Sequence, residues 1–153
     1  MKWLSVLLPA GIISTMALSV SPSLHAGEEA RIQEKPKEFH VHPIGYVRES
    51  EERTTIVIDK QYEAGLLRLE GLSHIWVLWW FDKNDTPEKR SILQVHPQGN
   101  PKNPLTGVFA THAPVRPNLI AMTRCKVLAV NDNIIEIDDI DAFPGTPVLD
   151  IKS

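Results

Sequence analysis

Residues 73–81 read Ser-His-Ile-Trp-Val-Leu-Trp-Trp-Phe, and this stretch constrains the fold more than any other. Seven apolar residues follow one another from Ile75 to Phe81. A run of this length is too short to span a membrane as a helix and is typical of a β-strand. The strand is expected either to be buried on both faces or to meet another subunit with its second face. Its three tryptophans favour packing in a core or dimer interface over ligand stacking.

The segments on either side of this strand carry similar signals. Short runs rich in β-branched and aromatic residues are separated by Gly, Pro, Asn and Asp, as expected for strands joined by turns. These runs cover residues 39–48, 54–59, 91–96, 107–111, 119–130 and 133–138. The last run follows a turn at 131–133, and its alternation predicts a hairpin with the strand before it.

One short helix is expected among these strands, at residues 61–70. Tyr62, Leu66 and Leu69 recur there at helical spacing, although Gly65 weakens the pattern. The sum is a mainly β domain, folded as a small closed or strongly curved barrel with one short helix.

The chain divides into three regions. Residues 1–26 resemble a signal peptide or anchor, because Lys2 precedes an apolar stretch that ends in a small residue at Ala26. Residues 27–38 form a polar linker, and residues 39–153 form the barrel domain. Use of the signal predicts a secreted, periplasmic or cell-envelope protein without a stable membrane span after cleavage. A translation start at Met16 would instead leave the protein in the cytoplasm.

Composition excludes several classes of protein. The 153 residues contain one cysteine, so no intramolecular disulfide can form and the core depends on apolar burial. Cys125 lies in an alternating strand and is expected to be a buried small hydrophobe. The formal net charge of −3 argues against a large electrostatic surface for nucleic acid or anionic membrane.

Two segments are candidates for ligand binding. Residues 96–123 are rich in proline, and Pro114 and Pro117 restrict the backbone on both sides of Arg116 and before Asn118. A second segment, residues 141–147, ends in the tight turn Pro-Gly-Thr-Pro. Each segment is either a stiff connection or a place where polar groups are held for a ligand.

Metal binding and hydrolysis have weaker support. His40 and His42 would share one face of a strand, but no Cys pair or His-Glu-x-x-His spacing accompanies them, so no metal site is predicted. Ser73 and His74 belong to a Ser-His-Asp triad only if they share a proton. Adjacent residues on a strand point to opposite faces, which argues against that triad.

Four segments are similar to the TsaA-like family, whose characterised members are S-adenosylmethionine-dependent tRNA adenosine N6-methyltransferases. They read HPIGYVR from His42, LEGLSHIWVLWWF from Leu69, GVFATHAPVRPNLIAMT from Gly107 and DIDAFPGTPVLDIK from Asp139. The resemblance implies a small single-sheeted barrel that forms a homodimer, with S-adenosyl-L-methionine bound near the subunit interface. It also makes tRNA a possible partner.

The resemblance extends to individual residues of the expected cofactor site. Arg116, Pro117 and Asn118 match the Arg-Pro-Asn segment of the family. The predicted cofactor-binding residues are His112, Arg116, Pro117, Asn118, Asp141, Gly145, Thr146 and Pro147. The sequence assigns no catalytic residue, although Asp141 and His112 are of a type that accepts a proton.

The chain departs from the family at several positions. His112 stands where the family has Arg, and Leu119 and Ala121 replace a Pro and a Gly. Residues 49–55 leave no room for the longer Pro-Arg-Gln loop that helps to hold the cofactor. Two functions follow as alternatives. One is a methyltransferase resembling the tRNA adenosine N6-methyltransferases, and the other is an exported small-molecule binding module without tRNA methylation.

Overall fold

The computed structural model describes residues 37–50 and 53–153 of the chain. The predicted signal peptide at 1–26 lies outside the described residues, as does nearly all of the predicted linker at 27–38. Residues 40–153 form one compact unit. Across the described residues, no helix has the length and apolar character that spanning a membrane requires.

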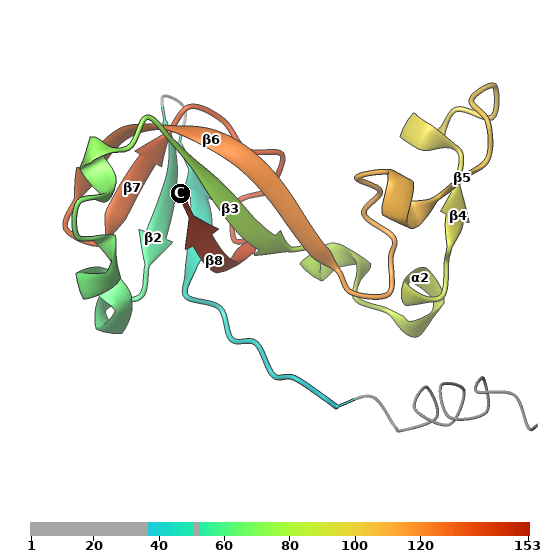
Figure 1. Ribbon diagram of the computed structural model, residues 1–153, viewed down its shortest axis with the longest axis horizontal. Helices are drawn as coiled ribbons and strands as arrows, with labels where there is room; N and C mark the ends of the chain where they lie inside the picture. The colour runs from blue at the N-terminus through green and yellow to red at the C-terminus, as the bar shows by residue number, and fades with distance from the viewer. Residues whose placement is uncertain (1–36, 51–52) are drawn as a thin grey trace, which may run out of the picture. The chain divides into compact units, whose positions relative to one another are not determined.

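A closed six-stranded barrel is the centre of this unit (Figure 1). Its neighbouring strands pair antiparallel in the order β1-β2-β7-β6-β3-β8, and β8 returns to β1. The strands are β1 (Gly45–Glu49), β2 (Thr54–Ile58), β3 (His74–Trp80), β6 (Ile120–Asn131), β7 (Ile134–Ile137) and β8 (Pro147–Lys152). The prediction of a mainly β barrel is therefore confirmed.

The core fills the barrel from alternate positions of each strand. The fully buried side chains include Val47, Ile56, Ile75, Val77, Ile135, Ile137 and Val148. Such alternation is the packing that a closed barrel requires, because successive residues of a strand face inward and outward. The predicted hairpin at 131–133 joins β6 to β7, as expected.

Strand β3 corrects one expectation. Its inward residues Ile75, Val77 and Trp79 are buried, but Trp76 on the outer face is 38% exposed. Within one chain this strand is therefore not buried on both faces. The strand therefore combines one core-facing row with an outer row that the described chain covers only in part.

The predicted helix at 61–70 is absent as an α-helix. Two 3₁₀ helices take its place, Lys60–Leu66 and Leu69–Gly71, separated by Arg68 in the left-handed conformation (φ 68°). Leu66 ends the first of these helices and Leu69 begins the second, and both side chains are buried.

A long excursion leaves the barrel after β3 and returns at β6 (Figure 1). It contains helix α2 (Pro87–Arg90), the short strands β4 (Gln94–Val95) and β5 (Thr106–Gly107), and 3₁₀ helices at Asp82–Asn84, Pro97–Gly99 and Val108–Ala110. Helix α2 begins after Thr86, whose hydroxyl accepts a hydrogen bond from the Lys89 amide at 3.3 Å. The strands expected at 91–96 and 107–111 are reduced to two residues each.

Candidate functional site

The Arg-Pro-Asn loop lies at the end of the excursion, immediately before β6. Arg116 donates a hydrogen bond through Nη2 to the Val108 carbonyl at 3.2 Å. The same carbonyl accepts from the Thr111 hydroxyl at 3.1 Å. The segment from Val108 to Arg116 is therefore closed on itself, with Asn118 exposed beyond it. His112 is also exposed on this segment.

The Gly-Thr-Pro turn lies at the start of β8 and is bonded to β1. Gly145 adopts a left-handed conformation (φ 87°), which an L side chain rarely adopts. Its amide donates to the Val47 carbonyl at 2.8 Å, and the Val47 amide donates to the Thr146 carbonyl at 3.0 Å. Thr146 is buried, whereas Asp141 at the start of the segment is exposed. The barrel thus fixes the turn and leaves the carboxylate accessible.

The two halves of the predicted site are on different parts of the unit. Among the described residues, no hydrogen bond or ion pair joins Arg116–Asn118 to the turn at 141–147. The turn does reach the base of the excursion, where the Lys83 ammonium lies 3.9 Å from the centre of the Phe143 ring. The arrangement brings this turn and the beginning of the excursion together.

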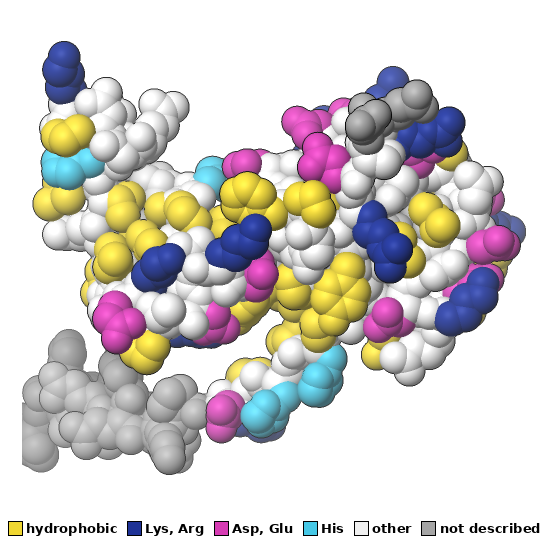
Figure 2. Space-filling view, turned by 180° about the vertical axis from the view of Figure 1, so that it is seen from behind, with side chains coloured by type: hydrophobic (Ala, Val, Ile, Leu, Met, Phe, Trp, Pro, Cys, Tyr) yellow, Lys and Arg dark blue, Asp and Glu magenta, His cyan; other side chains and the backbone are white. Residues whose placement is uncertain are grey.

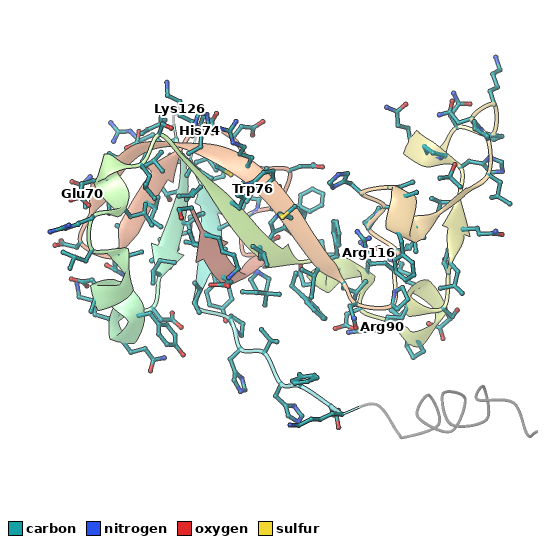
Figure 3. The ribbon with its side chains drawn as sticks, viewed as in Figure 1. Glu70, His74, Trp76, Arg90, Arg116 and Lys126 are labelled. Atoms are coloured by element: carbon teal, nitrogen blue, oxygen red, sulfur yellow. The ribbon has the colours of Figure 1, made fainter. Side chains whose placement is uncertain are left out.

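A neighbouring cluster was not found from the sequence. Arg90 of α2 donates through Nε to Asp85 at 2.7 Å and through Nη1 to the Pro117 carbonyl at 2.8 Å. Trp80 at the end of β3 also donates to Asp85, through Nε1 at 3.2 Å. Figure 3 shows Arg90 and Arg116 on the excursion. The Thr86-Pro87 helix start was a readable signal, but the contact with Pro117 was not.

The hydrogen bonds from Arg90 and then from Trp80 hold the pKa of the Asp85 carboxyl below its ordinary value. Both bonds stabilise the charged carboxylate, so the ion pair persists at neutral pH. The Asp85 carboxylate therefore stays charged and holds the Arg90 guanidinium beside the Arg-Pro-Asn loop.

An open groove of about 660 Å³ lies elsewhere on the unit. It is lined by Lys60, Glu63, Ala64, Leu66, Leu67, Glu70, Val130 and Asp132. None of the predicted cofactor residues lines it. Four of these lining residues are charged and four are apolar, and the groove is open to solvent.

Two other kinds of site considered from the sequence are a Ser-His pair and a metal site. Ser73 Oγ and His74 Nδ1 lie 3.2 Å apart, so the expectation that these side chains point apart is wrong. The reason is that Ser73 precedes β3 and does not share the alternation of that strand. Both residues lie in an exposed setting at the rim of the sheet. Among the described residues, no group of three His, Cys, Asp or Glu side chains is placed to hold a metal ion.

The barrel, the excursion and the Gly-Thr-Pro turn together define a protein of the TsaA-like class. The family described as the tRNA-methyltransferase O N-terminal domain matches residues 32–153, and the chain belongs to this family. Solved structures of similar fold include one of TrmO with a TM-score of 0.58 and 30% identity, and one of TrmO from Pseudomonas aeruginosa with 0.57 and 28%. The alignments cover 76% of this chain and only 57% and 55% of those chains.

Relatives of known name fall into two groups. A probable S-adenosyl-L-methionine-binding protein of Methanocaldococcus jannaschii is 46% identical over 114 residues, which are 74% of this chain and 90% of the relative. One from Pyrococcus horikoshii is 49% identical, covering 74% and 81%. The human tRNA (adenine(37)-N6)-methyltransferase is 41% identical over 90 residues, which are 59% of this chain and 20% of that enzyme.

Proposed function

We propose that this protein is an S-adenosyl-L-methionine-dependent methyltransferase. The observation that carries the proposal is the family match over residues 32–153, together with relatives of similar length that are named as binding proteins for this cofactor. The Arg-Pro-Asn loop and the Gly-Thr-Pro turn, on which the family resemblance rests, are both held by hydrogen bonds to the rest of the unit.

The polar groups present in these two segments fit the cofactor. S-adenosylmethionine has a carboxylate, an ammonium group, a sulfonium and ribose hydroxyls. Arg116 donates one hydrogen bond through Nη2 to the Val108 carbonyl, and its other N–H groups remain available to a carboxylate. Asp141 is exposed and, within the described part of the chain, has no ion-pair partner, so it is available to an ammonium or hydroxyl group. Asn118 offers both a donor and an acceptor.

The remaining predicted residues would shape the pocket. Gly145 would present no side chain, Thr146 and the two prolines at 117 and 147 would fix backbone direction, and His112 would stand at the exposed edge. When bound, the cofactor supplies an electrophilic methyl group that is transferred by direct displacement. The protein contributes mainly alignment of donor and acceptor. An amine acceptor also loses a proton, which Asp141 or His112 could accept.

The finer proposal is that the acceptor is an adenosine of tRNA. It is supported by the names of the mammalian relatives and by the charge of the excursion. Residues 82–119 carry five basic and three acidic side chains, although the whole chain has a net charge of −3. Phosphate contacts from such a segment would give the protein an orientation on RNA despite its overall acidity.

A second candidate is supported by a different observation. The signal-like residues 1–26 favour an exported protein, which would meet little tRNA or S-adenosylmethionine. On this alternative the barrel is a small-molecule binding module of the cell envelope. A cytoplasmic location would follow from translation that starts at Met16.

Calorimetric titration of the full chain with S-adenosylmethionine tests the proposal. We expect binding that Asp141→Asn and Arg116→Gln each weaken, while Glu70→Gln in the distant groove leaves it unchanged. Transfer of labelled methyl groups to bulk tRNA then tests the acceptor. Absence of binding by the wild type would overturn the methyltransferase proposal and favour the exported module. Binding without transfer to tRNA would retain the cofactor and reject the acceptor.

A further inference from the structure

The neck of the excursion is the place where β3 ends and β6 begins. The Phe81 amide donates to the Leu119 carbonyl at 2.8 Å, which continues the β3–β6 pairing by one step. Leu119 is fully buried. The Arg-Pro-Asn loop directly precedes Leu119, so this pairing attaches the loop to the barrel at its C-terminal end, where β6 begins.

Arg90 supplies a second attachment from across the neck. Its guanidinium makes two hydrogen bonds at once, one to the Asp85 carboxylate at 2.7 Å and one to the Pro117 carbonyl at 2.8 Å. It also lies over the Trp80 ring, 5.2 Å from the ring centre. A planar guanidinium with its donors in a fixed fork suits three simultaneous partners, whereas an ammonium group does not.

Trp80 and Asp85 fix the orientation of Arg90. Trp80 belongs to β3, and its indole donates to the second oxygen of the Asp85 carboxylate. Trp80 and Asp85 therefore hold the guanidinium at a fixed position relative to a barrel strand. The guanidinium in turn holds the Pro117 carbonyl, 27 residues further along the chain. Charge-assisted hydrogen bonds of this kind are stronger than neutral ones.

Pro117 is a well-suited point of attachment. The proline ring fixes its own φ, so holding its carbonyl restricts the directions of both neighbours, Arg116 and Asn118. Arg116 is meanwhile bonded to Val108 on the other side of the loop. Without Arg90, the loop would depend on that bond and on the β6 attachment alone.

We propose that Arg90 is a positioning residue: through the Pro117 carbonyl it presets the loop that presents Arg116 and Asn118 to the cofactor, with Asp85 and Trp80 holding its guanidinium. The inference rests on the proposed function for its consequence, which is cofactor affinity. Its structural part concerns the order of the loop and does not depend on any ligand. A preset loop raises affinity because less conformational freedom is lost on binding.

Three variants test the proposal by calorimetry with S-adenosylmethionine. Arg90→Gln removes the charge and the fork, and we expect binding about tenfold weaker or more, as for loss of a charge-assisted hydrogen bond. Arg90→Lys retains the charge but reaches only one of the two partners, so we expect an intermediate loss. Lys89→Gln is a matched control on the same helix. The Lys89 ammonium donates to the Lys83 carbonyl and not to the Arg-Pro-Asn loop, so this variant should bind as the wild type does.

Amide hydrogen exchange of residues 112–119 supplies a readout without ligand. We expect faster exchange in Arg90→Gln than in the wild type or Lys89→Gln, with the barrel strands unchanged. If the wild type binds no S-adenosylmethionine, the proposed function fails and the exchange data alone decide whether Arg90 orders the loop. Unchanged exchange in Arg90→Gln would overturn the inference.

A purely structural role would leave a different signature. In that case Arg90→Gln would lower the Tm of the whole unit, and Arg90→Lys would restore Tm and affinity together. If Arg90→Lys restores the Tm but still binds S-adenosylmethionine more weakly than the wild type, the positioning role is supported. Unchanged affinity in Arg90→Gln, with a wild type that binds, would also overturn the proposal.

Discussion

The Cys125 thiol lies inside the barrel on β6 and is fully buried. Desolvation by burial, with a further contribution from the Asp138 and Asp139 carboxylates, raises its pKa from 9.0 to about 12. The expectation of a buried small hydrophobe therefore fits its surroundings. A thiol with this pKa is almost entirely protonated at neutral pH, and the thiolate is the reactive form.

We predict that Cys125 resists thiol reagents in the folded protein at about pH 8, where an ordinary thiol with pKa near 8.5 reacts readily. In concentrated guanidinium the same reagent should modify one thiol per chain, because the sequence contains a single cysteine. Absorbance of the released chromophore measures both rates. The prediction would be contradicted if the thiol of the native protein reacted as fast as the thiol of the denatured protein.

Asp85 predicts a dependence of stability on pH. Its pKa is lowered below the ordinary 3.8, first by Arg90 and then by Trp80. A group whose pKa is lower in the folded state stabilises the fold above its ordinary pKa, and this contribution is lost as pH falls through the folded value. We expect Asp85→Asn to lower Tm at neutral pH and to converge with the wild type in acid.

Thermal unfolding at a series of pH values below about 5 measures this convergence. Asp82→Asn is the matched control, because Asp82 lies in the adjacent 3₁₀ helix and its side chain has no hydrogen-bond or ion-pair partner in the described part of the chain. A gap between Asp85→Asn and the wild type that stays constant down to acid pH would show that the ion pair is not the cause.

At the scale of elements, the β1–β2 pair depends on a close approach at Gly45. A Cβ atom built there would collide with the Val57 carbonyl oxygen and lie 2.8 Å from the Ile58 Cα. Both are backbone atoms of the neighbouring strand, so they cannot move without disturbing the ladder. Glycine at this position is therefore a packing requirement of the barrel.

We predict that Gly45→Ala lowers the free energy of unfolding by about 1–3 kcal/mol, the usual cost of overpacking. Urea-induced unfolding measures the change. Gly65→Ala is the control: a Cβ there meets nothing within 4 Å, and the φ angle is not in the left-handed region. It should be neutral or slightly stabilising, since alanine restricts the unfolded chain. Equal losses in both variants would refute the packing argument.

The strands of the barrel could be predicted because runs rich in apolar, β-branched and aromatic residues mark them locally. In the structure, inward residues recur at every second position of β2, β3 and β7 and along the first part of β6. Strand β1 begins later than expected, at Gly45, because Pro43 has no amide to donate to a ladder. Strands β4 and β5 are short for a related reason, since several prolines interrupt the excursion.

The candidate site was predictable only in part. The loop around Arg116 and the turn at Gly145 could be located because proline and glycine mark them locally. The contact from Arg90 to Pro117 joins residues that are distant in sequence, and no local pattern encodes such a pair. The α-helix expected at 61–70 is wrong because apolar spacing carries no signal of the left-handed turn at Arg68, which divides the segment into two 3₁₀ helices.

At the scale of the whole molecule, the described chain covers the outer face of β3 and β6 only in part: Arg90 lies over Trp80, but much of the remaining face is exposed. Cross-strand pairs place Leu78 beside Met122 and Trp80 beside Ile120. Met122 is 47% exposed and Ile120 is 41% exposed. Figure 2 shows exposed hydrophobic side chains on one face of the molecule, with Lys and Arg side chains among them. Contiguous apolar surface on β3 and β6 favours association, as the homodimer prediction requires.

We predict that the protein is a homodimer that uses this outer face, and that Met122→Glu converts it to a monomer. A two-fold interface brings the same patch of both copies together, so each dimer would bury two carboxylates without partners. Sedimentation velocity over a range of concentrations measures the outcome. Leu67→Glu is the control: Leu67 is 82% exposed in the turn between the two 3₁₀ helices, away from β3, and the variant should leave the dimer intact.

The predicted dimer would also affect the cofactor site, because no hydrogen bond or ion pair joins the two predicted halves of that site within one described chain. One possible arrangement forms the cofactor site from the Arg-Pro-Asn loop of one copy and the Gly-Thr-Pro turn of the other. On that arrangement, monomeric Met122→Glu should lose affinity for S-adenosylmethionine while its circular dichroism spectrum stays that of the native protein. Monomeric Met122→Glu that binds as tightly as the wild type would place a complete site in each chain. A wild type that sediments as a monomer at every concentration would contradict the dimer itself.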